Sequence, residues 1–508
     1  MRAVAELKPP SVMPGLEPPW WLAEALAAEA AGASGVGAGP VRPGALASEA
    51  AAGAEAHPGP DDALALSGDA DVDVAIVGGG YTGLWTALAL RERDPSLRIA
   101  VIEKEIVGWG PSGRNGGFLH GYWTHLTRLR GLIGDTAALE LCRLSDRIVP
   151  AVKAFSAARG EDIWLEEGGY LKVSAAPFED AAVDRAVEAA AQLGVPEECA
   201  LLSAGELAER VRSPRFRKAA FFRDGATVQP ARLARALRRA ALADGIALHE
   251  RTRLTALRAG SPNLLETPQG RLRAAEVVLA TNAWAAGWPP LSARLTNFGS
   301  YVVLTEPVPE LLEQIGWTGG ESISDGRMFL HYFRTTADGR VAMGSGSGPI
   351  GHGGGVDRRF FADARTAARA ELGLRKLLPA LADVRITHAW GGPIDVSSDH
   401  LPFFGTMPGK RIHYGAGYSG SGVGASWLGG QILASLVMRR SDEWTSLALV
   451  SRRVPRLPPE PFRRLGGGLV RAAILTQEEH EEDGRRAPLY ARAGAALPRL
   501  TGMKVGTR

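Results

Sequence analysis

Cysteine is almost absent from this sequence, since only Cys142 and Cys199 occur among its 508 residues. Both stand in helix-like polar stretches, without the CxxC or Cys/His spacing of a metal site. We therefore expect no metal and a reducing compartment. The N-terminus lacks the apolar core, about 7–15 residues long, of a secretory signal, and no later run of about 18 apolar residues could span a bilayer. These absences predict a cytoplasmic protein with no membrane span.

An excess of charge of either sign is also missing. The 58 basic and 55 acidic residues leave a formal net charge of +3, which gives no argument for a nucleic-acid partner or for an anionic membrane surface. With 45% hydrophobic and 22% charged residues, a chain of this length can bury a substantial core. The composition predicts a globular protein of about two or three domains.

Changes in composition divide the chain into four parts. Residues 1–26 contain the adjacent Trp20 and Trp21, and this segment is too aromatic for a solvated tail. The two tryptophans are expected to dock on the folded body; a sticky disordered end is the alternative. Residues 27–71 are rich in Ala, Gly and Pro and predict a flexible arm. The main body is expected over 72–440, and 441–508 form a C-terminal extension whose acidic run at 478–483 predicts a solvated surface.

A dinucleotide-binding turn follows the first strand-like run, 72–77. Gly78 permits the tight turn, Gly80 lets backbone amides approach a pyrophosphate, and Gly83 lets the following helix pack close to the sheet. That helix ends before Pro95, and a second apolar run at 99–102 leads to Glu103. An acid at this place accepts hydrogen bonds from ribose hydroxyls; a surface acid at a strand end is the alternative. The pattern predicts a strand-helix-strand unit that binds a dinucleotide.

Sheet-like and helical blocks alternate through the rest of the body. Strands are predicted at 169–174, 219–223, 300–305, 328–334 and 340–344, and they are expected to form one large mixed or antiparallel sheet. Helices are predicted at 230–243 and 422–438, and buried strands at 247–250 and 277–280. The fold class is therefore α/β, with a Rossmann-like domain from the segments 72–150, 225–290 and 385–440 and a substrate domain from 151–224 and 291–384.

The run Gly-Trp-Gly-Pro-Ser-Gly-Arg-Asn-Gly-Gly-Phe at 108–118 resembles the D-amino-acid-oxidase-like FAD-dependent oxidoreductase superfamily. The segments 227–230, 249–254, 280–284 and 417–423 resemble further parts of it in the expected order. Together with Trp20, Trp21 and the run 390–395, they are most similar to the γ-glutamylputrescine oxidase branch. The resemblance implies that FAD is bound by Gly78, Gly80, Gly83, Glu103, Lys104, Ser112, Gly113, Arg114, Asn115, Leu254, Thr281, Asn282, Gly417, Ser419, Gly420, Gly422 and Val423.

The resemblance also implies a non-covalent cofactor. Relatives that link FAD through a cysteine have it where Gly392 stands here, and those that use a histidine have it near Arg114. It further places Ala342 where sarcosine oxidases have a lysine that helps oxygen accept electrons from the reduced flavin. Slow reoxidation of the flavin by oxygen is therefore expected, unless another cation takes the place of that lysine. In the segment 417–423, which resembles the last flavin-binding loop of the family, Ser421 stands where relatives often have a histidine.

Candidate residues on the substrate side flank the segments that face the flavin. They are Tyr122, Trp123, His331, Tyr332, Trp390 and Ile394. Aromatic walls suit an amine cation and its methylene stem; for each residue, ordinary core packing is the alternative. Asp395, next to Ile394, would repel a carboxylate or attract an ammonium if it faced the pocket.

Ile394 replaces the arginine that pairs with the substrate carboxylate in glycine-oxidase-like relatives, unless the alignment is shifted or Arg334 or Arg327 takes over that role. The expected substrate is therefore a small amine, possibly with a distant polar group. The family implies that hydride leaves the carbon next to a neutral amine for flavin N5, and that the imine product hydrolyses.

Two other functions stay open at this point. One is a dehydrogenase, acting for example on an amino acid, that passes electrons to an acceptor other than oxygen. The other is a flavin-binding subunit without activity of its own. No Ser-His-Asp set, metal cluster or carboxylate pair competes with the flavin as a reaction centre.

Overall fold

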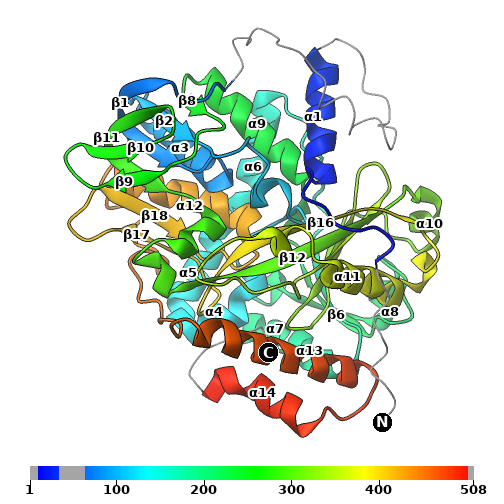
Figure 1. Ribbon diagram of the computed structural model, residues 1–508. Helices are drawn as coiled ribbons and strands as arrows, with labels where there is room; N and C mark the ends of the chain where they lie inside the picture. The colour runs from blue at the N-terminus through cyan, green and yellow to red at the C-terminus, as the bar shows by residue number, and fades with distance from the viewer. Residues whose placement is uncertain (1–9, 34–62, 501–508) are drawn as a thin grey trace.

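Two large sheets form the body of the molecule (Figure 1), in a computed structural model that describes residues 10–33 and 63–500. The first sheet has the order β17-β18-β11-β1-β2-β8, and β10 and β9 extend it from β11. Its strands are β1 (Gly68–Val77), β2 (Ile99–Ile102), β8 (Ala247–His249), β9 (Ala256–Arg258), β10 (Asn263–Glu266), β11 (Gly270–Leu279), β17 (Phe403–Thr406) and β18 (Ile412–Ala416). The strands β18, β11, β1, β2 and β8 are parallel, as a Rossmann-like sheet requires.

The second sheet has the order β16-β12-β15-β14-β13-β4-β6-β5 and is antiparallel except between β13 and β4. Its strands are β4 (Tyr170–Ser174), β5 (Ala200–Ser203), β6 (Lys218–Phe222), β12 (Leu295–Thr305), β13 (Ser322–Ser324), β14 (His331–Thr335), β15 (Val341–Ser345) and β16 (Ile386–Ser397). The large mixed sheet is thus confirmed, and all five predicted strands belong to it. A two-stranded ribbon of β3 (Phe118–His120) and β7 (Gly225–Thr227) is separate from both sheets.

Helices surround the two sheets. They are α1 (Trp20–Ala33), α3 (Tyr81–Arg93), α4 (Leu126–Ile133), α5 (Asp135–Ser145), α6 (Ile148–Arg159), α7 (Asp180–Gln192), α8 (Ala204–Ala208), α9 (Pro230–Ala243), α10 (Pro309–Gln314), α11 (Ala364–Leu377), α12 (Gly422–Val437), α13 (Phe462–Glu482) and α14 (Leu489–Leu500). The helix α9 has the bounds that the sequence predicts, and α12 ends one residue earlier. Within the described part of the chain, no helix combines the length and the apolar character needed to cross a membrane.

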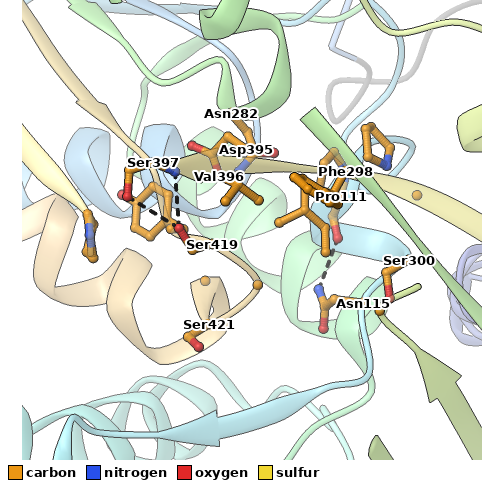
Figure 2. Close-up of a pocket in the computed structure, with 18 of the residues that line it drawn as sticks. Pro111, Asn115, Asn282, Phe298, Ser300, Asp395, Val396, Ser397, Ser419 and Ser421 are labelled. Atoms are coloured by element: carbon orange, nitrogen blue, oxygen red, sulfur yellow. Dashed lines mark hydrogen bonds between the residues drawn. The ribbon is translucent and has the colours of Figure 1, made fainter. Parts of the chain in front are cut away.

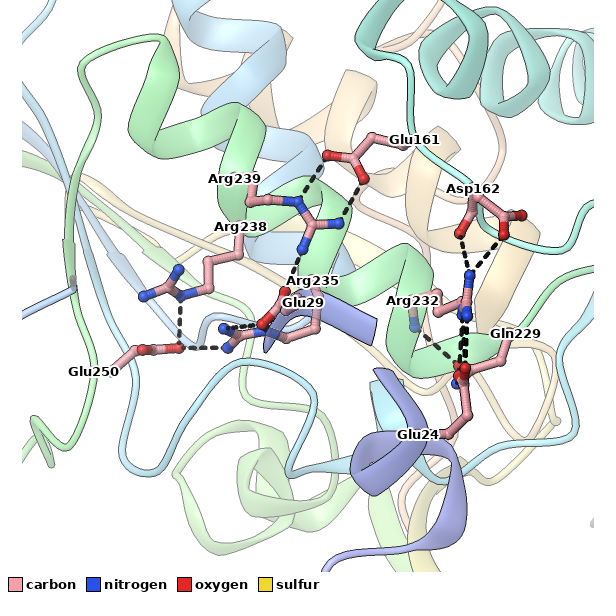
Figure 3. A network of polar contacts seen from close by, with 10 residues as sticks. All are labelled: Glu24, Glu29, Glu161, Asp162, Gln229, Arg232, Arg235, Arg238, Arg239 and Glu250. Carbon is pink, nitrogen blue, oxygen red and sulfur yellow. Dashed lines mark hydrogen bonds and ion pairs between the residues drawn. The ribbon is translucent and has the colours of Figure 1, made fainter. Parts of the chain in front are cut away.

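The N-terminal helix α1 packs against α9. Trp21 is fully buried, and its ring centroid lies 5.8 Å from that of Trp390 in β16. Acids on α1 pair with the basic face of α9 (Figure 3), for example Glu29 with Arg235 at 2.8 Å. The expected arm over 27–71 is therefore too long at both ends, because α1 continues to Ala33 and β1 begins at Gly68. Its middle, 34–62, lies outside the described residues.

The C-terminal extension forms α13 and α14, which lie together along one side of the molecule (Figure 1). The expectation that 478–483 forms a solvated surface is wrong for two of its acids. Glu478 is buried and accepts a hydrogen bond from the Met328 amide at 2.7 Å, and Glu482 pairs with Arg327 at 2.6 Å. In a helix, residues four apart share one face, and this face of α13 packs on the protein body.

Candidate active site

A large cavity, with a volume of about 1,030 Å³, connects the carboxyl ends of β1, β2 and β11 with the inner face of the second sheet. Figure 2 shows side chains from both sides around it, with Asn115 on one side and Asn282, Ser419 and Ser421 on the other. Parallel α/β sheets bind ligands at the carboxyl edge of their strands. We call the part next to β1 and β2 the cofactor end, and the part next to β4, α4 and α13 the substrate end.

The glycine turn at the cofactor end has no room for side chains. Gly78 has φ +108°, and a Cβ on it would lie 2.4 Å from the Ala280 carbonyl oxygen. A Cβ on Gly83 would lie 1.9 Å from the Gly78 carbonyl oxygen, although Gly83 itself does not line the cavity. The turn therefore brings Gly78, Gly80 and the amino end of α3 to the cavity wall, where backbone amides and the helix dipole favour a pyrophosphate.

Glu103 lies at the end of β2, beside this turn. Its carboxylate accepts hydrogen bonds from the amides of Gly79, at 2.8 Å, and Glu105, at 3.0 Å. Burial raises its pKa, and the two amide hydrogen bonds oppose that rise. Lys104 and Leu254 line the same end of the cavity, so these residues surround the place expected for an adenosine.

The loop at 108–118 is held by its own side chains. Asn115 donates to the carbonyl oxygens of Pro111, at 3.0 Å, and Ser112, at 3.1 Å, and it accepts from the Gly117 amide at 2.7 Å. Arg114 donates to the carbonyl oxygens of Trp109 and Gly391 at 2.8 and 3.1 Å, and burial lowers its pKa to about 10.

Gly113 does not line the cavity; a Cβ there would lie 1.9 Å from the Gly108 carbonyl oxygen. Gly113 therefore shapes the loop without reaching the cavity. Ser112, Arg114 and Asn115 line the cavity, and Arg114 holds the loop in place as well.

Asp395 joins two further segments of the cavity wall. Its carboxylate accepts from the Asn282 side chain at 2.9 Å and from the Gly417 amide, and burial raises its pKa to about 7 against these hydrogen bonds. Asp395 also lines the cavity, so it faces the pocket while these two hydrogen bonds hold it in place. Thr281 and Asn282 line the cavity, and the buried Asn282 Oδ1 has no hydrogen-bond partner in the described chain.

The last loop leads into α12 and supplies the remaining wall of the cofactor end. Ser419, Gly420, Gly422 and Val423 line the cavity, whereas the Gly417 amide is taken by Asp395. The amino end of α12 begins at Gly422, so its dipole favours negative charge on a group in this place.

These features fit FAD. The glycine turn leaves space that any Cβ would fill, an amide oxygen of Asn282 is buried without a partner, and two helix amino ends face one elongated cavity. The turn and Glu103 would hold the adenosine diphosphate part, and the 112–115, 281–282 and 419–423 segments would hold the flavin.

Three of the six substrate-side candidates line the cavity, namely Tyr122, Tyr332 and Ile394. The Tyr122 hydroxyl is buried without a hydrogen-bond partner among the described residues. The Tyr332 hydroxyl lies 2.7 Å from Ser300 Oγ, and burial raises its pKa to about 12. Ile394 Cδ1 would contact a Cβ placed on Gly420 at 3.9 Å, so it lies beside the last loop.

The other three candidates, His331, Trp390 and Trp123, do not line the cavity. Side chains alternate along a strand, so His331 points away from the cavity that Tyr332 lines, and its Nδ1 lies 2.7 Å from Asp325 Oδ2. Trp390 is buried against Trp21, with its Nε1 donating to the Arg114 carbonyl oxygen at 3.0 Å. Trp123 is buried and donates to Asp146.

Ala342 is also absent from the cavity wall. It is buried in the cluster that Trp20, Trp21 and Leu22 form against the second sheet. The position of Ala342 therefore gives no support to the expectation that oxygen reoxidises the flavin slowly.

The sequence did not indicate several residues at the substrate end. His125, Arg128, Tyr170 and Lys172 line it, as do residues of α13 including Val470 and Ile474. These residues belong to no motif, and only the packing of distant segments brings them together.

Comparison with known proteins agrees with this geometry. The family model described as FAD dependent oxidoreductase matches residues 73–436. The chain belongs to this family. It is 28% identical over 419 residues to the probable oxidoreductase OrdL of Rhizobium meliloti (strain 1021), an alignment that covers 81% of this chain and 91% of that protein. It is 28% identical over 397 residues to the gamma-glutamylputrescine oxidoreductase of Escherichia coli (strain K12), covering 77% and 87% of the two chains.

Among solved structures, the glycine oxidase of Geobacillus kaustophilus superposes with a TM-score of 0.63 at 25% identity, covering 76% of this chain and all of that one. The predicted superfamily, fold class and FAD cofactor are thus confirmed, and the protein is an FAD-dependent oxidoreductase.

Proposed function

We propose that this protein oxidises a small primary or secondary amine of the putrescine-derivative type to an imine, which hydrolyses in water. The observation that supports this proposal most is Ile394 in the cavity wall, because an apolar side chain stands there at the position of the arginine that pairs with the carboxylate of an α-amino acid in glycine-oxidase-like relatives. A bound FAD would accept the hydrogen and two electrons from the carbon next to the nitrogen.

Neither Arg334 nor Arg327, the two arginines that could take over the role at Ile394, lines the cavity. Arg334 is buried, donates to the carbonyl oxygens of Val228 and Thr335, and does not line the cavity. Arg327 pairs with Glu482 at 2.6 Å. An unpaired carboxylate against Ile394 would cost on the order of several kcal/mol, so an α-amino acid fits this wall poorly.

Aromatic residues support the binding of an amine with a methylene chain. Phe118, Tyr122, Tyr170 and Tyr332 all line the substrate end. Apolar walls favour the neutral form of an amine, which is the form able to lose hydride, because burial disfavours charge. The free Tyr122 hydroxyl oxygen would accept a hydrogen bond from the amine N–H and orient the neighbouring carbon, while the aromatic rings exclude water.

The names of the relatives agree with this choice in part. One relative is a gamma-glutamylputrescine oxidoreductase, and others are glycine oxidases. The choice between an amine and an amino acid therefore depends on the wall around Ile394. The electron acceptor, oxygen or another molecule, and the cytoplasmic location stay predictions.

The test is reduction of the bound flavin without oxygen. Putrescine, its acylated forms and simple alkylamines are mixed with the enzyme, and bleaching of the flavin absorbance is followed. Glycine, D-alanine and D-proline are measured in parallel. We expect amines to bleach the flavin faster; efficient bleaching by the amino acids alone would overturn the proposal, and bleaching by neither class would indicate a subunit without activity.

FAD is expected to be held without a covalent bond. Gly392 occupies the position of the linking cysteine, and neither Cys142 nor Cys199 lines the cavity. Acid precipitation should leave the yellow colour in the supernatant, and a yellow pellet would contradict this expectation.

A further inference from the structure

Two cations at the substrate end have no partner among the described residues. Arg128 on α4 and Lys172 on β4 both line the cavity. Neither side chain makes a hydrogen bond or an ion pair with any residue in 10–33 or 63–500, whereas arginines elsewhere in the cavity wall, such as Arg114 and Arg463, donate to carbonyl oxygens. Basic side chains inside a protein are normally paired.

The local structure directs both cations into the cavity. His125, Arg128 and Leu129 are spaced three and four residues apart, so they share one face around the start of α4, and all three line the cavity. On β4, Tyr170 and Lys172 point to the same side because side chains alternate along a strand. Leu171 lies on the opposite face, in the core of the second sheet.

The acids nearby are already engaged. Asp399, whose charge acts on Arg128, forms two hydrogen bonds with Arg452 at 2.6 and 2.8 Å. Asp325, which also lines the cavity, pairs with His331 at 2.7 Å. The positive charge of Arg128 and Lys172 is therefore not neutralised within this wall.

Burial disfavours the charged form of both side chains. Burial, and then the charge of Arg128, lowers the pKa of Lys172 to about 8, and burial lowers that of Arg128 to about 10. The neighbouring histidines contribute no charge at neutral pH, because burial lowers the pKa of His400 to about 3 and that of His125 well below its usual value. A bound anion would relieve the repulsion between the two cations.

We propose that Arg128 and Lys172 bind a carboxylate that the amine substrate carries. This inference rests on the proposed function, since it names the class of amine that the same cavity takes. The guanidinium offers paired donors that match a carboxylate, and the ammonium adds a second charge.

His125 connects the two cations with the last loop. His125 Nε2 is 3.0 Å from Ser421 Oγ in the last loop, and Arg128 is near enough to His125 to lower its pKa. Ile394 contacts the same loop at Gly420. A carboxylate bound by these cations would therefore lie on the His125 side of the last loop.

The first experiment measures binding of glutarate to the FAD-loaded enzyme by calorimetry, with the uncharged isostere glutaramide for comparison. We expect glutarate to bind, glutaramide to bind much more weakly, and Arg128→Gln or Lys172→Gln to weaken glutarate at least about tenfold. The matched control is Arg130→Gln, since Arg130 is on the same helix but points to Asp135 at 2.9 Å and is absent from the cavity wall. Equal binding of glutarate to all four proteins, or no binding to the native enzyme, would overturn the proposal.

Thermal unfolding separates a binding role from a structural one. Removing an unpaired, partly buried charge should leave stability unchanged or raise it, so Lys172→Met and Arg128→Met should unfold at or above the native temperature. Glutarate should raise the unfolding temperature of the native protein and not that of these variants. Lower stability of both variants would show that the cations are structural.

Flavin reduction then connects the site with turnover. β-Alanine, γ-aminobutyrate and δ-aminovalerate are compared with propylamine, butylamine and pentylamine. We expect a lower KM for at least one carboxylated amine than for its methyl-ended partner, and loss of this difference in Arg128→Gln. If the alkylamines reduce the flavin equally well and glutarate does not bind, the carboxylate site is wrong while the proposed function stands; if no amine reduces the flavin, the proposed function is wrong.

Discussion

The two ends of the cavity differ in how they are built. The cofactor end comes from short motifs in which a few glycines and polar residues adjoin along the chain, such as Gly78 to Gly83 and Ser112 to Asn115. The substrate end collects single side chains from α4, β4, β14, β16 and α13, which are far apart in sequence. The first end is therefore sensitive to backbone space, and the second to the charge and size of individual side chains.

The largest effect is expected at the cofactor end. Gly83→Ala places a Cβ 1.9 Å from the Gly78 carbonyl oxygen, so α3 must move away from the turn. We expect the variant to be purified with little or no FAD, measured as the ratio of flavin to protein absorbance. Gly287→Ala is the control, because a Cβ there meets nothing within 4 Å. Full flavin content in Gly83→Ala would show that the turn tolerates a side chain.

The N-terminal helix α1 packs outside the cavity, against α9 and β16. Trp21→Ala removes a fully buried ring that packs on Trp390, and a large-to-small change of this kind costs about 3–5 kcal/mol. Chemical unfolding of the FAD-loaded enzyme should show a loss of this size. The control Met13→Ala changes a side chain that is 65% exposed and should alter stability by less than about 0.5 kcal/mol. A small loss for Trp21→Ala would mean that α1 contributes little to the core.

At the substrate end, Ile394→Arg should change the preference between substrates. A guanidinium in this wall can pair with an α-carboxylate, so flavin reduction by glycine should improve relative to butylamine by about tenfold or more. Ile394→Met, which keeps the wall apolar, should leave the ratio near its native value. An unchanged ratio in Ile394→Arg would indicate that the amino-acid carboxylate does not bind at this wall.

The smallest expected effect is a pH dependence of carboxylate binding. A carboxylate favours protonated Lys172, whose pKa is lowered to about 8, so glutarate affinity should be constant below that pH and fall above it. The fall should stay within about tenfold up to pH 9. Around Lys172, Arg128 stays charged because its pKa is about 10, Arg185 adds further positive charge, and the Cys199 thiol stays neutral because burial raises its pKa to about 12.

Lys172→Gln is the control for this titration and should abolish the fall. Glutarate itself does not titrate in this range, so a fall that persists in the variant would assign the dependence to another group. A flat profile in the native enzyme would remove Lys172 from the carboxylate site.

Sequence reasoning succeeded where the physical constraint is local. The spacing of Gly78, Gly80 and Gly83 follows from the sterics of one turn, and the strand and helix periods gave the bounds of β2 and α9. It failed for His331, Trp390 and Ala342, because an alternating strand offers two faces and the pattern alone does not say which face meets the cavity. The buried acids Glu478 and Glu482 were missed because a charged run is usually solvated.

The sequence by itself determined the α/β class and the dinucleotide turn, since each depends on residues that are adjacent in the chain or repeat at a fixed period, and its resemblance to a known family identified the cofactor. Tertiary structure alone decided which aromatic residues line the cavity, that α13 closes part of its wall, and that Arg128 and Lys172 face the same space without a partner in the described part of the chain. These contacts join segments separated by tens to hundreds of residues, and they exist only once two sheets and their helices have packed.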